Sequence, residues 1–529
     1  MAAVAYGELS PVDLDLPLLQ LTPRDFFRLR DAVLGLLVTG GIGAGKTTAM
    51  KAVALAYLMF GMGGIVMCAK PGEAQRWLQY CQQAGRAESV IVMNGRNVCF
   101  NFLDYEISRH GINGIDSAIE CLMQLVEAAR MASASPGREG EKFWTDMIRQ
   151  VLRVILPLLY MAYGRVTIPD IIRCLRSAPT SREEAHSAQW QADSFLYQTL
   201  LVAAQRVGDH DPTLNRIADY MLNEWATMPD KTRGNVAVSL TTVLDRFTSG
   251  WLKDTFASDT NCPPEMTFHG AVVILDMPPS TMNEDGLLAQ IIYKFMWQRA
   301  VLARGGLDPI QRVRPVFWWA DEGHLFLHPN DANFLSLCRE ALACVVLISQ
   351  SLPSFYGRMP GENSKDIVHQ LLGNFGSRLW LNNACHETNG WASATLGKVI
   401  HRRANFSEGR SEGHNMSYGM NMGENASRSV NWDQTHYHSS PLNPITKHSG
   451  NEGSGESWGR NKGYGSNYGT NSSHGYSEQM DDLLPPAFFS RSLMTGGPSN
   501  GNRVSGVWFQ AGRTFEASRG NSLLAVFQQ

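Results

Sequence analysis

Hydrophobic and polar positions in the first hundred residues follow an alternating strand and helix pattern. An apolar run at 34–39 (LGLLVT) predicts a buried strand, a glycine-rich loop covers 40–45, and helical spacing follows over 46–60. Two further apolar runs, at 65–69 and 89–93, predict a second and a third strand. Strand, helix and strand at this spacing predict the start of a parallel α/β sheet.

The pattern changes to helical periodicity over residues 115–252, where strand candidates are scarce. Within it, Thr167-Ile168-Pro169-Asp170 predicts a helix start, with threonine as the cap and proline in the first turn. We therefore expect an all-α domain inserted into the α/β core. The remaining strands of the sheet are predicted at 271–276, 316–320, 344–349 and 378–382, with a helix over 286–302.

The amino-acid composition changes again after Arg403, and the new composition continues to about residue 480. This segment is dense in Gly, Ser, Asn, Tyr and His and poor in aliphatic residues, so it cannot bury a core of its own. We expect a loop excursion that is either disordered or a long polar hairpin. Strand patterns return at 504–509 and 523–527.

Composition allows two or three ordinary domains with a large core, because 44% of the 529 residues are hydrophobic and 18% are charged. The formal net charge of −3 gives no overall basic character. It does not exclude nucleic acid, since a ring can concentrate positive charge in a narrow pore. The 9 cysteines include no C-x-x-C pair, so we expect core thiols in a reducing compartment.

Targeting and membrane signals are weak. The N-terminus has no basic stretch followed by an apolar run, as a secretory signal would. The uncharged stretch 52–69 is about long enough to span a bilayer, but Gly61, Gly63 and Gly64 interrupt it directly after the glycine-rich loop. A buried helix, a turn and a buried strand explain it better. We expect a cytoplasmic protein without a membrane span.

The glycine-rich loop fits the pattern G-x-x-x-x-G-K-[ST] between a strand and a helix, which is the context that phosphate binding requires. Its backbone N–H groups would converge on ATP phosphates, Lys46 would neutralise their charge, and the Thr47 hydroxyl would bind Mg²⁺. The alternative is a chance glycine turn. The residues predicted to bind ATP are Gly40, Gly41, Ile42, Gly43, Ala44, Gly45, Lys46, Thr47 and Thr48.

A second candidate element is the apolar strand at 316–320, which ends in Asp321 and Glu322. In a Walker B element Asp321 would hold the magnesium ion through water, and Glu322 would polarise the attacking water. The alternative is an acidic pair that only caps the next element. Gln350, at the tip of the strand at 344–349, is a candidate γ-phosphate sensor or an ordinary strand-end amide.

Other charged positions are weaker candidates. Arg339 is either an arginine finger that reaches a neighbouring subunit's ATP or a surface arginine. His324 and His328 lack a third ligand, so we favour solvent-facing or supporting histidines over a metal site. A short basic run is either solvated or a contact for phosphates; it consists of Lys398, His401, Arg402 and Arg403.

Taken together, the order of these elements resembles the FtsK–HerA superfamily of DNA-pumping ATPases, and within it the TraG/TraD-type coupling proteins of conjugation and type IV secretion. The stretches that carry the resemblance include LLVTGGIGAGKTT, VMCAKPGE, FWWADEGH and LCREALACVVLISQSL. Ala69 stands where the family often has an acidic residue, which is a departure. Coupling proteins usually begin with transmembrane helices, and no such pattern occurs here, so we expect no membrane span in this sequence.

The resemblance implies a RecA-like P-loop NTPase core in a homohexameric ring around DNA, with ATP at subunit interfaces. One subunit would supply Lys46, Thr47, Asp321, Glu322 and Gln350, and its neighbour Arg339. Relaxase, type IV secretion components or a nuclease are the implied protein partners. The expected division is 1–114 and 253–403 for the ATPase core, 115–252 for the inserted all-α domain, 404–480 for the low-complexity segment and 481–529 for C-terminal strands that complete the core.

Three functions remain open at this point. The first is an ATP-driven DNA translocase of conjugation or mobile-element transfer. The second is a HerA-like ATPase that acts with a nuclease in DNA repair or phage defence. The third is a nucleotide-binding assembly scaffold without turnover, which the complete set of Lys46, Asp321 and Glu322 disfavours. The sequence has no LSGGQ-like signature and no N-K-x-D guanine reader, which argues against transporter ATPases and GTPases.

Overall fold

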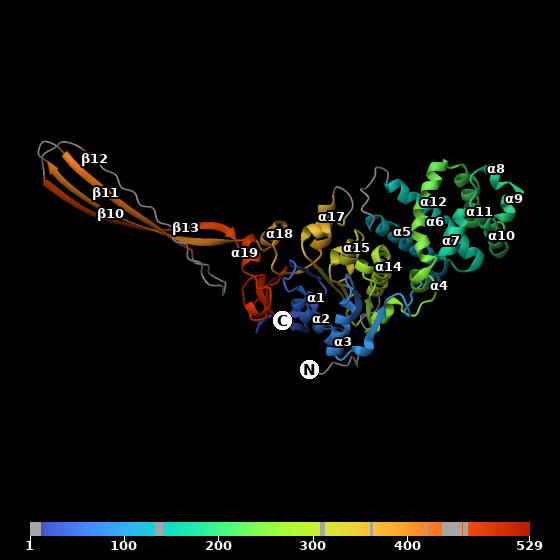
Figure 1. Ribbon diagram of the computed structural model, residues 1–529, viewed down its shortest axis with the longest axis horizontal. Helices are drawn as coiled ribbons and strands as arrows, with labels where there is room; N and C mark the ends of the chain where they lie inside the picture. Colours follow the sequence, from blue (N-terminus) through green and yellow to red (C-terminus); the bar gives the residue numbers. More distant parts are fainter. Residues whose placement is uncertain are drawn as a thin grey trace. The chain divides into compact units, whose positions relative to one another are not determined.

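The computed structural model describes residues 12–132, 141–306, 313–359, 363–417, 421–435, 457–458 and 464–529 (Figure 1). The chain divides into two compact units. The first comprises Met1–Thr388, Leu493–Ala511 and Leu524–Gln529, and the second comprises Asn389–Ser492 and Gly512–Leu523. The glycine-rich loop and its structural neighbours discussed below belong to the first unit.

A large sheet forms the centre of the first unit, and within the described residues it has nine strands in the order β15-β14-β9-β3-β8-β7-β4-β6-β5. The strands from β9 to β5 pair in parallel, whereas β14 runs antiparallel to β9. The predicted strands are therefore confirmed within a few residues. Their bounds are β3 Leu36–Thr39, β4 Gly63–Met67, β5 Val90–Met93, β6 Val272–Leu275, β7 Val316–Ala320, β8 Ala343–Ser349, β9 Ser377–Trp380, β14 Arg503–Gln510 and β15 Ser522–Gln528.

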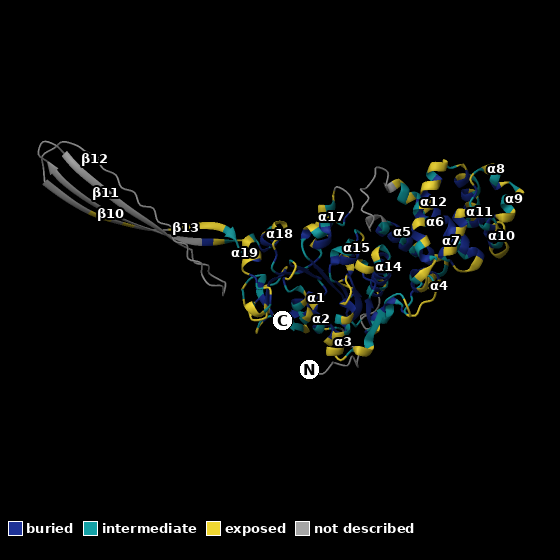
Figure 2. Cartoon of the chain, viewed as in Figure 1, coloured by how far each residue is buried: buried dark blue, intermediate teal, exposed yellow. Residues whose placement is uncertain are grey.

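Helices cover both faces of this sheet, which explains why its parallel strands are apolar along their whole length. Strand β7 shows the two faces, because neighbouring side chains on a strand point in opposite directions. Trp77 of α3 (Glu73–Gln83) stacks on Phe317 at 5.7 Å between ring centroids and meets Trp319 edge-on. On the other face Trp318 packs against Phe334 of α15 (Asp331–Leu337). The central strands are accordingly dark blue in Figure 2.

Between β5 and β6 the described chain is helical, as the periodicity predicts. Thr167 caps its helix by accepting a hydrogen bond from the backbone N–H of Asp170, and proline occupies the first turn. The helix pattern begins earlier than expected, at Phe102. The bounds are α4 Phe102–His110, α5 Gly114–Ala132, α6 Glu141–Tyr163, α7 Ile168–Arg176, α8 Arg182–Ala185, α9 Ala188–Asp193, α10 Phe195–Val207, α11 Pro212–Asp219, α12 Asp230–Leu244 and α13 Gly250–Phe256.

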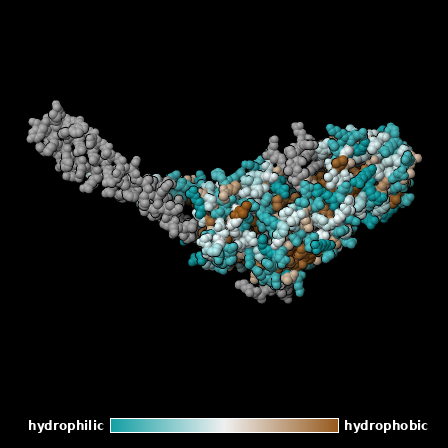
Figure 3. All heavy atoms as spheres, viewed as in Figure 1, coloured by the Kyte–Doolittle hydropathy of each residue, from teal (hydrophilic) through white to brown (hydrophobic). Residues whose placement is uncertain are grey.

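Other helices of the first unit connect and cover the strands. They are α2 (Lys46–Met59), the long α14 (Pro279–Gly305), α16 (Leu352–Tyr356) and α17 (Ser364–Gly373). A short hairpin of β1 (Pro17–Gln20) and β2 (Phe26–Arg28) precedes α1 (Leu29–Ala32). Figure 3 shows hydrophobic residues scattered in small groups among hydrophilic ones on the visible face.

The second unit contains the Gly-, Ser- and Asn-rich segment, whose described residues form antiparallel strands in the order β12-β11-β10-β13. Pairing of β10 with β13 runs from Lys398↔Asp482 to Met416↔Tyr464. Of the two expectations for this segment, the described part takes the form of paired polar strands. Residues 418–420, 436–456 and 459–463 lie outside the described residues. The bounds are α18 His386–Leu396, β10 Lys398–Ser417, β11 Asn421–Thr435, β12 Ser457–Trp458, β13 Tyr464–Asp482 and α19 Pro486–Arg491.

Two negative expectations concern cysteines and membrane spans. All nine cysteines are free, and seven of them are buried. Among the described residues no single helix is both long and apolar enough to cross a bilayer, although the bent pair Phe143–Tyr163 and Ile168–Arg176 passes that test together.

Candidate nucleotide-binding site

The glycine-rich loop lies between β3 and α2, at the carboxyl edge of the parallel sheet. Two of its backbone groups are tied to neighbouring strand ends, since Gly40 N–H donates to the carbonyl of Ser349 and Gly41 N–H to that of Asn382. Gly45 has a φ of 81°, and a Cβ there would collide with Val504 of β14. Only glycine fits this position, which explains the last glycine of the motif.

Lys46 begins helix α2 and curls back over the loop. Its Nζ donates to the carbonyl of Gly40 at 2.7 Å and to that of Gly41 at 3.0 Å. Burial lowers the pKa of Lys46, although Glu322 and Asp321 act in the opposite direction. In the described part of the chain no carboxylate lies within ion-pair distance of this ammonium group. The two loop carbonyls thus hold the ammonium group over the loop, and no carboxylate among the described residues pairs with its charge.

The acidic pair follows β7 at the same edge of the sheet. Strand β8 lies between β3 and β7, so the acidic pair is one strand away from the loop. Glu322 has left-handed backbone angles (φ 50°, ψ 44°), and its N–H donates to Asp321 Oδ1 at 3.0 Å. Non-glycine residues rarely adopt this conformation, which concentrates at functional sites. This turn sends Glu322 to a buried position, where the residue is 4% exposed.

One oxygen of Glu322 carries all of its side-chain hydrogen bonds. Oε1 accepts from Lys70 Nζ at 2.6 Å and from Gln350 Nε2 at 3.2 Å. Among the described residues nothing hydrogen-bonds to Oε2, which is buried and lies 3.7 Å from His324 Nδ1. Burial alone would raise the pKa of Glu322, but the bonds from Lys70 and Gln350 outweigh burial and lower it. Glu322 is therefore an ionised carboxylate with one free oxygen, which suits a general base.

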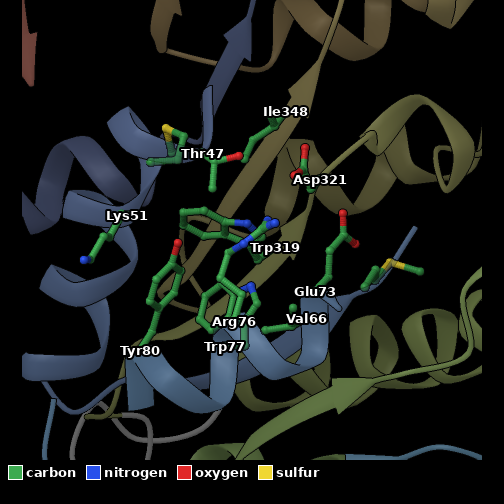
Figure 4. A pocket seen from close by; sticks show the side chains of 12 residues that line it. Thr47, Lys51, Val66, Glu73, Arg76, Trp77, Tyr80, Trp319, Asp321 and Ile348 are labelled. Atoms are coloured by element: carbon green, nitrogen blue, oxygen red, sulfur yellow. The ribbon is translucent and has the colours of Figure 1, made fainter. Parts of the chain in front are cut away.

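Thr47, Asp321 and Glu73 approach one pocket from α2, the end of β7 and α3 (Figure 4). Glu73 Oε2 accepts hydrogen bonds from the N–H groups of Ala69 and Lys70 at 2.7 and 3.3 Å. Burial, and then the charge of Asp321, raise the pKa of Glu73 to about 7. Burial and the neighbouring Glu322 likewise raise the pKa of Asp321. A Thr hydroxyl and a carboxylate are oxygen ligands that suit Mg²⁺, which keeps several waters of its own.

Some predicted residues do not join this site. Arg339 is exposed in the turn before β8, and β8 starts at the amino edge of the sheet, opposite the glycine-rich loop. Lys398, His401, Arg402 and Arg403 belong to β10 in the second unit. His324 donates to or accepts from Ser349 Oγ at 3.1 Å beside Glu322. His328 is 2% exposed, so of the two expected alternatives, solvent-facing or supporting, it is not solvent-facing.

Sequence reasoning missed two residues of the site, Lys70 and Glu73. Both lie in the block VMCAKPGE, which contributed only to the family resemblance. A usable signal existed, because this block contains the end of β4, and β4 is the parallel neighbour of β7. Polar residues at the carboxyl ends of adjacent parallel strands converge. The strand order that makes β4 and β7 neighbours was needed to use that signal.

The fold and the arrangement of the loop and acidic strand define a RecA-like P-loop NTPase fold with a helical domain. No family model matches the sequence, and no curated protein matches it. Among solved structures the chain is similar to the bacterial conjugative coupling protein TrwBdeltaN70. Its trigonal form in complex with sulphate aligns with a TM-score of 0.51, and its unbound monoclinic form with 0.50. Both are 13% identical and cover 94% of this chain, and 86% and 85% of theirs. At this identity the likeness establishes the fold.

Proposed function

We propose that this protein is a Mg²⁺-dependent ATPase that moves DNA in conjugation or another mobile-element transfer. The observation that carries the proposal is the convergence of Lys46, Thr47, Asp321 and Glu322 at one sheet edge, within a fold like that of a conjugative coupling protein. This set contains both a phosphate-binding group and a candidate base. A scaffold that binds nucleotide without turnover would not need a buried, ionised Glu322.

The chemistry follows from what each residue can do. The loop amides and Lys46 would hold the phosphates, while Thr47 and Asp321 would hold Mg²⁺. When bound, Mg²⁺ neutralises phosphate charge. The free Oε2 of Glu322 would accept a proton from the attacking water. Gln350, at the tip of β8, would act as the γ-phosphate sensor. Catalysis then depends on positioning and electrostatic stabilisation.

The test compares ATP hydrolysis without DNA, with single strands and with duplex, in wild type and in Lys46→Ala. We expect turnover in wild type, stimulation by one form of DNA, and none in Lys46→Ala because phosphate charge is no longer neutralised. Unchanged turnover in the variant would refute the loop assignment. ATP turnover that does not change when DNA is added would support an ATPase but refute the translocase function. Capture of a nuclease with the ring would favour the repair or defence alternative.

Assembly into a ring with Arg339 acting on a neighbour's ATP is the finer part of the proposal. Its support is the position of Arg339 at the sheet edge opposite its own loop, which argues against action on the ATP of its own subunit. Mixing Lys46→Ala with Arg339→Ala subunits creates some interfaces with an intact loop and an intact arginine. Activity should return in the mixture. Equal inactivity before and after mixing, with subunit exchange verified, would exclude a finger in trans.

A further inference from the structure

Lys70 and Gln350 hold the same oxygen of Glu322 from opposite neighbours of β7. Lys70 follows β4 and Gln350 follows β8, and these two strands flank β7 in the sheet. Their donor atoms lie 2.6 and 3.2 Å from Oε1. The two contacts together define where the carboxylate plane lies, because one donor alone leaves it free to rotate about χ3.

The backbone segments that carry the two donor residues are each held by hydrogen bonds. The turn that carries Lys70 is closed by Glu73, whose Oε2 accepts the N–H groups of Ala69 and Lys70. Gly72 has a φ of 86°, which lets α3 begin directly after this turn. On the other side the carbonyl of Gln350 accepts from Asn383 Nδ2 at 2.8 Å. The backbone that carries each donor is therefore fixed at the end of a strand next to β7.

The contact between Lys70 and Glu322 also has an asymmetry of exposure. The Glu322 side chain is 6% exposed, whereas that of Lys70 is 55% exposed. A half-exposed lysine contributes little to stability through an ion pair. The Glu322 carboxylate accepts from both Lys70 and Gln350, so the loss of one donor still leaves it a hydrogen bond. The pair is thus better suited to hold Glu322 in a defined state than to hold the fold together.

We propose that Lys70 is a positioning residue for hydrolysis: with Gln350 it clamps Oε1 of Glu322, so that Oε2 is the oxygen presented to the attacking water. This inference rests on the proposed function, because it assigns the base role to Glu322. The proton moves from water to Oε2 while Oε1 keeps its two donors. Lys70 itself touches neither water nor phosphate in this scheme.

The experiment measures kcat and KM for ATP, the affinity for a non-hydrolysable ATP analogue, and Tm in four proteins: wild type, Lys70→Met, Lys70→Arg and the control Lys253→Met. Lys253 is exposed on α13, so its variant should behave as wild type. Lys70→Met should lower kcat by about 10- to 100-fold, the cost of a misplaced catalytic group. The KM, the analogue affinity and Tm should stay unchanged. Lys70→Arg should recover part of kcat, because it retains a cation for Oε1.

Introducing Lys70→Met into a Glu322→Gln background separates positioning from an independent role. A residue that acts through Glu322 should cause no further loss there. An equal loss in both backgrounds, or a lower analogue affinity at unchanged kcat, would overturn the inference by making Lys70 a direct phosphate contact. If wild type hydrolyses ATP and Lys70→Met matches it, only this inference fails. If wild type does not hydrolyse ATP, the proposed function fails with it.

Discussion

Two lysine–carboxylate pairs flank the segment that follows β7, and they differ only in their surroundings. Lys294 with Asp331, and Lys70 with Glu322, both have an N–O distance of 2.6 Å. The first pair is enclosed, with side chains 2% and 3% exposed, whereas Lys70 is 55% exposed. Lys294 also donates to the carbonyl of Phe326, and Asp331 accepts from Gln298 and from the His328 N–H. The enclosed pair has a complete set of partners, and the open pair leaves one oxygen free.

The difference teaches that ion-pair distance does not decide what a pair does. In the enclosed pair each charge depends on the other, because water cannot replace a lost partner. That pair ties α14 to the chain after the acidic strand and serves the fold. In the open pair water can solvate Lys70 if it leaves Glu322, so the pair can serve chemistry at small cost to stability. Four substitutions or conditions test this division.

The largest effect should come from Glu322→Gln, which keeps the shape of the side chain but removes the proposed base. We expect ATP turnover to fall by about 10²- to 10⁴-fold. Binding of a non-hydrolysable ATP analogue should remain, and the free energy of unfolding should change by less than about 1 kcal/mol. Steady-state kinetics and urea unfolding of the same preparation provide both numbers. Turnover equal to wild type would show that Glu322 is not the base.

Lys294→Met should mainly affect the fold, because it leaves the Asp331 carboxylate buried without its cation. Loss of one partner of such a pair costs about 3–5 kcal/mol of unfolding free energy. Thermal and urea unfolding measure this loss. Lys294→Met combined with Asp331→Asn removes both charges and should recover part of it. If the single variant is as stable as wild type, the enclosed pair does not have the structural role assigned here.

Acid should weaken the enclosed region through His328. Burial, and then the nearby Lys294, lower the pKa of this imidazole to about 4 from 6.5, although Asp331 opposes the shift. The folded state resists protonation of His328. The stabilisation that comes from keeping this imidazole neutral is therefore complete above pH 6.5 and is lost as pH falls toward 4, by up to about 3 kcal/mol. Unfolding free energies from pH 7 to 4 should show this slope, and His328→Gln should flatten it. An unchanged slope in the variant would assign the acid sensitivity to other groups.

The smallest effect should be that of Lys70→Met on stability. Because Lys70 is more than half exposed, we expect a change in unfolding free energy within about 1 kcal/mol, and one that diminishes with added salt. Urea unfolding at low and high ionic strength measures it. A loss as large as that of Lys294→Met would place the two pairs in the same class and remove the contrast.

Local pattern was enough to predict the individual elements. The apolar runs at β3, β4, β7 and β8 can be recognised because strands covered on both faces must exclude polar residues. Residues 40–47 carry their own backbone requirements, such as the positive φ at Gly45. The helix start at Thr167 follows from a capping pattern that reaches only from Thr167 to Asp170. Each of these signals is complete within a short window of sequence.

The parts that failed or were missed depend on distant residues. Lys70 and Glu322 are 252 positions apart, and their contact exists because β4 and β7 are neighbours in the sheet. The burial of His328 likewise depends on α14. Lys294 of this helix pairs with Asp331, and Asp331 also accepts the N–H of His328. A short window of sequence gives the type of each residue, but it does not show which distant strand ends that residue will contact in the fold.

The sequence by itself determined the glycine-rich loop, the apolar strands and the helical region, because backbone geometry and local burial preferences act within a few residues. The tertiary structure alone decided which oxygen of Glu322 is held and which is free, which lysine pair is enclosed, and on which edge of the sheet Arg339 lies. The physical reason is that charge, burial and hydrogen bonding at a site depend on strand order, and strand order results from long-range pairing of the whole chain.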